Sequence, residues 1–427
     1  MFQIPRGTRD IPPDEMYKRR YVESTMRRTF ISFGYREIQT PTFEHLELFT
    51  AKSGEGIINE IYSFKDKSGR DLALRPELTA PVIRFYVDQM QMQPKPLKLF
   101  YFGNCFRYDR PQKGRYREFQ QAGCELIGAG TPEAHAELIA LAYNILKNTG
   151  LSDIRLYIGN LTILHHLFKM MGLTDEQKRY ITPLIDKALY DELSSFLEEI
   201  KIDKNMIHEF LDLIQNNNIE KIQPYINKND DTVKSLEHLK EITVLLEDSY
   251  SIKNYNLKLG IVRGLDYYQD IVFEIEAPKL GAEKQLCGGG AYNLVKLFGG
   301  TDIPTSGFAI GFDRTIIALE SEGYKFPTHT LDTYIIPVGE DMIPVSLKLS
   351  TKLRETGITV DVDLLRRGLS KSLKYASSIK AKNAIIIGSE EYKNNTVIIR
   401  DLETGEQKTT KIDDINNVVK KTKQNNK

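Results

Sequence analysis

The sequence contains few cysteines. It has only three, Cys105, Cys124 and Cys287, in 427 residues, and no two of them form a Cys-x-x-Cys pair. A disulfide framework or a tetrahedral zinc site requires cysteines that are grouped more closely. We therefore expect neither, and we expect the three thiols to act as small buried side chains.

Long apolar runs and net charge are also missing. No segment is apolar over the length needed to cross a membrane, and Met1 to Gly7 lack the apolar run of a signal peptide. Because 58 basic residues balance 58 acidic ones, no overall field attracts nucleic acid, and such binding must use local patches. We expect a cytoplasmic enzyme or binding protein without membrane association. Its length predicts two or three domains.

The most informative stretch present is a hairpin around residues 97–125. Residues 97–108 are rich in Phe, Tyr and Leu, which is typical of a half-buried strand. Pro111 and Gly114 then break regular structure. The loop is strongly basic, with one acidic residue, Asp109, against Arg107, Arg110, Lys113, Arg115 and Arg117. This concentration of positive charge is typical of a site for polyphosphate or nucleic acid.

The second arm of this hairpin allows two interpretations. Side chains alternate along a strand, so Phe119, Gln121, Gly123 and Glu125 share one face. That face is either a polar outer surface with a bulge at Gly123, or a pocket floor where Gly123 makes room for a ligand held by Gln121 and Glu125. The basic loop favours the pocket.

A similar choice concerns Glu77 and Thr79, which precede a helix predicted from Pro81 to Val87. In an extended segment both side chains would point the same way, and an acid with a hydroxyl suits an ammonium ligand. Alternatively, Thr79 caps the helix. The two roles are compatible.

Local signals predict the other elements. A helix starts at Pro13 and ends before Gly34, a strand covers 35–43, residues 60–64 and 71–74 form a hairpin, and a helix capped by Thr131 runs to about Asn148. Residues 167–250 are rich in Leu, Ile, Lys and Glu and predict a helical insertion. Residues 331–427 alternate between strand and helix patterns, which indicates parallel strands covered by helices.

Three later segments carry further candidates. Arg263 and Tyr268 belong to the run Arg-Gly-Leu-Asp-Tyr-Tyr, and three consecutive glycines at 288–290 permit a close backbone approach. Residues 307–314 pass from a strand into a helix, with Arg314 in the first turn. The helix dipole disfavours a cation there, so we expect an anionic partner for Arg314.

Taken in order, these motifs closely resemble the histidyl-tRNA synthetases, a family of class II aminoacyl-tRNA synthetases, over nearly the whole chain. Residues 35–43, 106–125 and 307–314 resemble the three class II motifs. The runs at 74–77, 110–117 and 263–268 resemble segments specific to the histidine family.

The resemblance implies an α+β fold with an antiparallel sheet core. It implies a catalytic domain at 1–325 with the insertion at 167–250, a C-terminal α/β anticodon-binding domain at 331–427, and an obligate homodimer. It also implies a two-step reaction, in which histidine and Mg-ATP form histidyl-adenylate and pyrophosphate, and the histidyl group then passes to the 3′ end of tRNA(His).

The resemblance also assigns residues. Those for L-histidine would be Glu77, Thr79 and Gln121 on the α-ammonium, Glu125 and Tyr268 on the imidazole with Tyr267 nearby, and Arg263 on the carboxylate. Those for ATP would be Arg107, Arg314, Arg115 and Asp109. Arg263, Arg107 and Arg314 would be catalytic through electrostatic stabilisation, and no protein-bound metal beyond the Mg²⁺ of ATP is implied.

The chain departs from the family pattern at three positions. Asp109 stands where Glu often contacts adenine, and Ala291 and Asn293 stand where many members have Arg and Asp. In a regular strand, Arg263 and Tyr268 would also face opposite sides. If both residues reach one ligand, Gly264 must break the strand.

Two alternatives to the enzyme are open. One is a synthetase-like regulatory subunit of ATP phosphoribosyltransferase, a type that typically lacks the anticodon-binding domain and the ATP-site arginines. The other is a plain nucleic-acid-binding module, which leaves Glu77, Gln121 and Glu125 unexplained.

Overall fold

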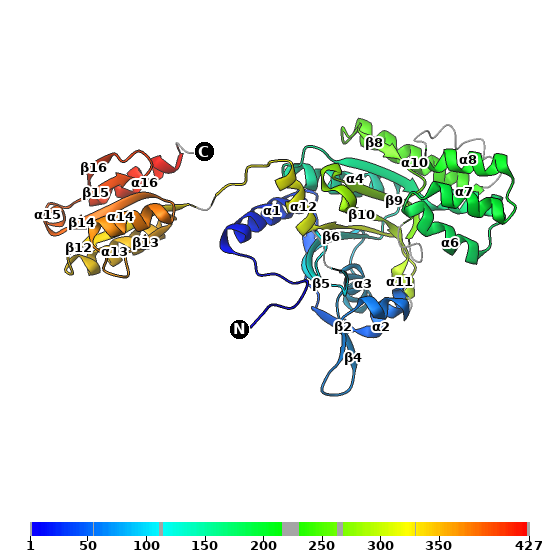
Figure 1. Cartoon of the computed structure of the whole chain (residues 1–427), viewed down its shortest axis with the longest axis horizontal. Helices are drawn as coiled ribbons and strands as arrows, with labels where there is room; N and C mark the ends of the chain where they lie inside the picture. Colours follow the sequence, from blue (N-terminus) through cyan, green and yellow to red (C-terminus); the bar gives the residue numbers. More distant parts are fainter. Residues whose placement is uncertain are drawn as a thin grey trace. The chain divides into compact units, whose positions relative to one another are not determined.

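The computed structural model describes residues 2–53, 55–110, 114–215, 230–262, 268–328 and 330–424. The chain divides into two compact units, Met1–Phe326 and Pro327–Lys427. Each unit has its own sheet (Figure 1). Each also has its own hydrophobic core.

The larger unit is built on a sheet that has eight strands within the described residues. Its strands, in spatial order, are β1 (Arg36–Glu37), β5 (Leu97–Phe106), β6 (Glu118–Ile127), β11 (Thr305–Gly311), β10 (Gln285–Tyr292), β9 (Tyr268–Glu276), β7 (Arg155–Asn160) and β8 (Tyr255–Leu257). Neighbours pair antiparallel except for the edge pairs β1–β5 and β7–β8. This sheet confirms the predicted α+β fold with an antiparallel core.

Helices α1 (Pro13–Ser32), α4 (Pro132–Asn148), α5 (Leu161–Met170) and α12 (Phe312–Ser321) accompany this sheet. The Thr131 side chain accepts a hydrogen bond from the Ala134 amide and so caps α4 as predicted. The ring of Phe30 in α1 stacks on Phe100 of β5 with centroids 4.8 Å apart. These contacts join the helices and the sheet in one core.

A second sheet, of three strands within the described residues, confirms the predicted hairpin. Strands β3 (Ser63–Lys65) and β4 (Asp71–Leu74) pair antiparallel, and β2 (Phe43–His45) joins the other side of β4. The elements around them are α2 (Leu46–Ser53), η1 (Glu55–Glu60), α3 (Thr79–Phe85), η2 (Tyr86–Met90) and α11 (Leu294–Leu297). The short helix η3 (Pro278–Glu283) instead connects β9 to β10 of the large sheet and contacts α12.

The predicted strand over residues 35–43 is wrong. Only Arg36–Glu37 pair with β5, and β2 begins at Phe43 in the other sheet. Pro41 lies between them and has no amide hydrogen to donate to a sheet, so it separates the two strands.

The described residues between β7 and β8 are mainly helical, as predicted for the insertion. Its helices after α5 are α6 (Asp175–Asp186), α7 (Tyr190–Glu199), α8 (Lys204–Gln215) and α10 (Asp230–Asp248). Figure 1 shows α6, α7 and α8 as one group. Thr174 and Gln177 form a capping box at the start of α6.

The smaller unit holds strands β12 (Leu331–Val338), β13 (Val360–Val362), β14 (Ala381–Gly388), β15 (Thr396–Asp401) and β16 (Gln407–Lys411), in the spatial order β13-β12-β14-β15-β16. Its helical elements are α13 (Met342–Glu355), α14 (Leu369–Ser378), α15 (Ser389–Lys393), η4 (Ile412–Asp414) and α16 (Ile415–Gln424). Alternate residues of β12 enter different clusters, Ile335 with α13 and Tyr334 with α14, so helices cover both faces.

The predicted parallel pairing holds for β12, β13 and β14 but is wrong for β14 and β15. β14 pairs antiparallel with β15, and β15 antiparallel with β16. The helix between β14 and β15 has only five residues, too few for a parallel crossover. Among the residues described in both units, no helix is long and apolar enough to cross a membrane.

Candidate active site

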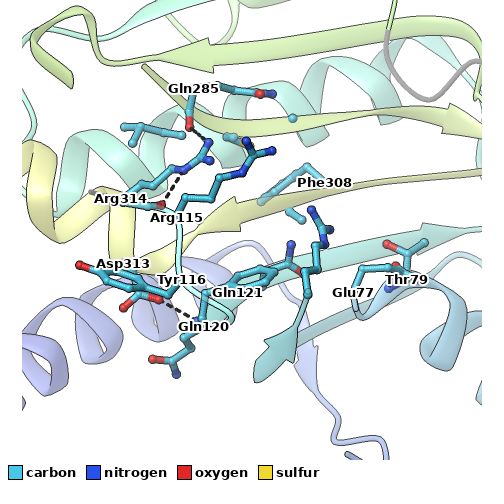
Figure 2. A pocket seen from close by; sticks show the side chains of 18 of the residues that line it. Glu77, Thr79, Arg115, Tyr116, Gln120, Gln121, Gln285, Phe308, Asp313 and Arg314 are labelled. Carbon is cyan, nitrogen blue, oxygen red and sulfur yellow. Dashed lines mark hydrogen bonds between the residues drawn. The ribbon is translucent and has the colours of Figure 1, made fainter. Parts of the chain in front are cut away.

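A cavity of about 280 Å³ lies in the larger unit over the β5–β6 hairpin and the neighbouring strands β10 and β11. Figure 2 shows Arg115 and Arg314 at one end of it, Glu77 and Thr79 at the other, and Gln121 between them. Arg107, Asp109 and Tyr268 also line it. Tertiary folding therefore brings together most of the residues that the sequence singled out.

The cationic end is held by hydrogen bonds to backbone carbonyls. Arg107 Nε donates to the Pro76 oxygen at 3.0 Å. Arg314 Nε and Nη1 donate to the oxygens of Gly114 and Gln285, at 3.2 and 3.1 Å (Figure 2). These bonds orient the guanidinium groups, which are the side chains best suited to a polyphosphate ligand.

Arg115 is held by a charged partner. Its Nε lies 2.6 Å from Asp109 Oδ2, and both side chains are partly exposed. A ligand phosphate at this end would compete with Asp109 for Arg115.

The acidic end is built at the start of α3. Glu77 accepts hydrogen bonds from the backbone amides of Thr79 at 2.6 Å and Ala80 at 3.1 Å. The expectation that Thr79 caps the helix is therefore wrong, because the carboxylate of Glu77 does so. Both side chains still line the cavity, so helix capping and ligand binding are compatible here.

Glu125 lies below this cavity and is not among its lining residues. It is 1% exposed. The phenol of Tyr101 donates to Oε1 at 2.9 Å, and the phenol of Tyr292 donates to Oε2. Burial raises the pKa of the Glu125 carboxyl to about 8, although hydrogen bonds from the two phenols and from Thr79 act to lower it.

Gly123 does not make room for a ligand, and both interpretations given for it are wrong. A Cβ there would lie 2.6 Å from the Phe308 oxygen and 2.7 Å from the Tyr101 ring, so protein atoms already fill the space next to Gly123. β6 also pairs with β5 and β11 in continuous register through Gly123, without a bulge. The absence of a side chain at Gly123 instead leaves space for the ring of Tyr101, whose phenol binds Glu125.

Two further predicted residues, Gln121 and Tyr268, line the cavity. Gln121 Oε1 accepts a bond from Cys105 Sγ at 3.3 Å, and the ring of Tyr268 lies across that of Tyr292 with centroids 6.3 Å apart. All three cysteines are buried, as expected. Arg263 and Tyr267 lie outside the described residues, as does the strand break expected at Gly264.

The departures at Ala291 and Asn293 are not themselves lining residues, although Tyr292 between them lines the cavity. Ala291 pairs with Ser306 of β11, and Asn293 precedes α11. In the described part of the chain, Asn293 Oδ1 is buried without a hydrogen-bond partner. Ala291 thus lies within β10, and Asn293 directly follows that strand.

Several residues of the site gave no signal in the sequence. Asp313 lines the cavity and binds Arg9 and Arg19, which are about 300 positions away in the chain. Tyr116, Gln120 and Tyr292 line the same cavity. No group of three or more His, Cys, Asp or Glu residues is placed to hold a metal ion within the described ranges.

An antiparallel sheet that carries cationic and acidic side chains at opposite ends of one cavity is the arrangement expected of one class of enzyme, the nucleotide-dependent ligases that activate amino acids. The comparisons with known proteins narrow this class. The model of the family "Histidyl-tRNA synthetase" matches residues 7–315, and that of the "Anticodon binding domain" matches residues 332–422.

Individual relatives agree with these matches. The Histidine--tRNA ligase of Archaeoglobus fulgidus is 47% identical over 403 residues, which are 94% of this chain and 96% of that protein. The crystal structure of apo S. aureus histidyl-tRNA synthetase is 31% identical with a TM-score of 0.76, over 98% of this chain and 100% of that one.

A structure from Bacillus halodurans, of an ATP phosphoribosyltransferase regulatory subunit/histidyl-tRNA synthetase, is 25% identical with a TM-score of 0.79, over 91% of this chain and 99% of that one. The chain belongs to the histidyl-tRNA synthetase family. The predicted family and the class II fold with an anticodon-binding domain are thus confirmed, and so is the predicted ligase at the level of the family.

Proposed function

We propose that this chain joins histidine to tRNA(His) in two steps at the cavity over the β5–β6 hairpin. Histidine and ATP form histidyl-adenylate and pyrophosphate, and the histidyl group then passes to the 3′ end of the tRNA. The observation that supports this proposal is the presence of cationic and acidic side chains at opposite ends of one cavity.

Histidine occupies the end near α3. Glu77, Thr79 and Gln121 hold its α-ammonium, because a carboxylate with neutral acceptors satisfies three N–H donors. Glu125 and Tyr268 recognise the imidazole, with Tyr267 nearby. A buried polar pair rejects side chains that would leave it without partners, which favours histidine over apolar amino acids of similar size.

ATP occupies the cationic end and enters as its Mg²⁺ complex. Arg107, Arg314 and Arg115 bind the phosphates, and together with Mg²⁺ they neutralise the negative charge of these groups. Asp109 lies toward the adenine. Arg263 binds the histidine carboxylate and then the α-phosphate. The reaction requires no covalent nucleophile, so these residues act by positioning the substrates and stabilising developing charge.

The remaining parts of the chain serve the tRNA and the assembly. The catalytic domain covers 1–325 with its insertion at 167–250, and the anticodon-binding domain covers 331–427. The loop cations not used by ATP, Arg110 among them, face the acceptor end of the tRNA. The protein acts in the cytoplasm as a homodimer.

The two alternative functions fit the molecule less well. The regulatory-subunit type typically lacks an anticodon-binding domain and ATP-site arginines, whereas residues 332–422 match such a domain and Arg107 and Arg314 line the cavity. A plain nucleic-acid-binding module has no use for the ammonium-binding end at Glu77 and Gln121.

The test of the proposal is histidine-dependent exchange between ATP and pyrophosphate, followed by charging of tRNA(His). We expect both activities in the wild type. In Arg263→Ala we expect exchange to be slower by about 10² or more, because the charge developing at the α-phosphate loses its counterion. If the pure, folded wild type shows no exchange, the proposed enzymatic activity is refuted. If the variant exchanges at the wild-type rate, the role assigned to Arg263 is refuted.

A further inference from the structure

The N-terminal segment before α1 runs along the base of the β5–β6 loop. The backbone amide of Arg117 donates to the Gly7 oxygen at 2.9 Å, and Arg117 Nη1 donates to the Arg6 oxygen at 3.4 Å. The segment is therefore attached to the strand end that carries Arg115 and Tyr116.

Arg9, at the end of this segment, contacts two walls of the cavity. Its Nη2 lies 2.6 Å from Asp313 Oδ1, in the first turn of α12. Its guanidinium also covers the ring of Tyr116, 4.3 Å from the centroid, and its Nη1 binds Glu15 at 2.8 Å. Asp313 and Tyr116 line the cavity, whereas Arg9 is not a lining residue.

Asp313 connects this arginine to the ATP end. Its side chain is only 6% exposed, and Oδ1 binds both Arg9 and, at 2.5 Å, Arg19. Oδ2 accepts the backbone amide of Gln120 in β6 at 2.7 Å (Figure 2). The next residue is Arg314, so the orientation of Asp313 sets the start of the helix from which Arg314 reaches the cavity.

The two arginines on Asp313 differ in what else they hold. Arg19 is buried and also binds the side chain of Gln120 at 2.9 Å, so it secures α12 to β6. Arg9 is partly exposed and secures α12 to Tyr116 in the loop. If Arg9 is removed, Asp313 keeps one buried guanidinium partner, and the fold retains its ion pair while the loop loses an attachment.

We infer that Arg9 is a positioning residue for the ATP end of the cavity, acting through Asp313 and Tyr116. It holds the start of α12, with Arg314, against the loop that carries Arg115. The inference rests on the proposed function for the identity of the ligand. The histidine end is organised separately, because Glu77 is held by amides of its own helix.

The chain offers a matched control. Lys18 of α1 forms an ion pair with Glu320 of α12 at 2.7 Å, with both side chains partly exposed. Lys18→Met therefore removes a cation that links the N-terminal region to α12 without touching Asp313 or Tyr116.

The experiment compares wild type, Arg9→Met, Arg9→Lys and Lys18→Met. In histidine-dependent ATP–pyrophosphate exchange, we expect Arg9→Met to raise the KM for ATP about tenfold and to leave the KM for histidine within about twofold. Arg9→Lys should recover part of the ATP affinity, because an ammonium can pair with Asp313 but matches neither the fork nor the stacking of a guanidinium. Lys18→Met should behave as wild type.

Calorimetric titration with ATP separates this inference from the proposed function. If the wild type binds ATP but catalyses no exchange, the proposed function is refuted. The ratio of the Kd for ATP in Arg9→Met to that in wild type would still test the role of Arg9. The inference is overturned if ATP affinity in Arg9→Met stays within twofold of wild type, or if both KM values rise together with a lowered Tm. If Arg9→Met is not recovered folded, Arg9→Lys decides by the same criteria.

Discussion

The charge of Glu125 shows how strongly surroundings control a single residue. Two phenols hold the carboxyl oxygens, and hydrogen bonds of this kind favour the ionised form. Burial acts in the opposite direction and is the larger effect, so the pKa lies at about 8. Near neutral pH the proposed imidazole-binding residue can therefore donate or accept a hydrogen bond after the transfer of one proton.

This pKa predicts a dependence of stability on pH. The ordinary value for Glu is 4.5, so between pH 4.5 and about 8 the folded chain holds a proton that the unfolded chain has lost. The contribution of Glu125 to stability therefore falls as the pH rises through this window and levels off above it. One pKa unit corresponds to about 1.4 kcal/mol, so the whole effect is on the order of a few kcal/mol.

Glu125→Gln lacks this titration. In calorimetric scans without ligand, we expect the Tm of the variant minus that of wild type to become more positive by several degrees between pH 5 and pH 8.5. A Tm difference that does not change over this range would show that Glu125 titrates at its ordinary pKa.

At the scale of the element, β6 is held between its neighbours by close backbone contacts. Gly123 lies between the Tyr101 ring and the Phe308 oxygen, and Gly307 of β11 leaves space for the Glu125 carboxyl. The side chain of Glu125 can be buried between three strands because both glycines lack a Cβ.

Gly123→Ala tests this packing. Its Cβ would approach the Phe308 backbone oxygen, which cannot move without shifting β11, so we expect a loss of about 1–3 kcal/mol in stability. Gly368→Ala is the control, since its Cβ enters open space without a positive φ. If thermal unfolding shows equal Tm values for the two variants, the close packing around Gly123 has no energetic weight.

At the scale of the whole molecule, the two units have separate cores and contribute differently to the proposed reaction. All residues that line the cavity lie before residue 327, and the match to the anticodon-binding domain lies after it. Activation of histidine should therefore depend on the first unit, and capture of the tRNA on both.

A chain truncated after Phe326 tests this division. We expect it to keep histidine-dependent ATP–pyrophosphate exchange within a few-fold of the full chain. Charging of tRNA(His) should fall by about 10² or more, because a second binding contact on the same ligand is lost. Undiminished charging by the folded fragment would show that the second unit does not contribute to tRNA binding.

The elements that the sequence predicted correctly are those with local signals. α1 begins after Pro12 and ends before Gly34, Thr131 caps α4, and the glycine turn between β3 and β4 joins a hairpin. The errors occurred where the partner was remote. The strand at 35–43 failed because only β5 accepts part of it, and β15 was expected to pair parallel although its connection to β14 is too short.

The same distinction applies to the site. By itself the sequence determined which residue types line the cavity, because Arg107, Glu77, Gln121 and Arg314 lie within short motifs. Only the tertiary structure decided that Glu77 caps α3, that Gly123 serves Tyr101, and that Arg9 supports Asp313. The last two roles depend on distances between residues far apart in the chain, and such distances are set only when the strands and helices have packed together.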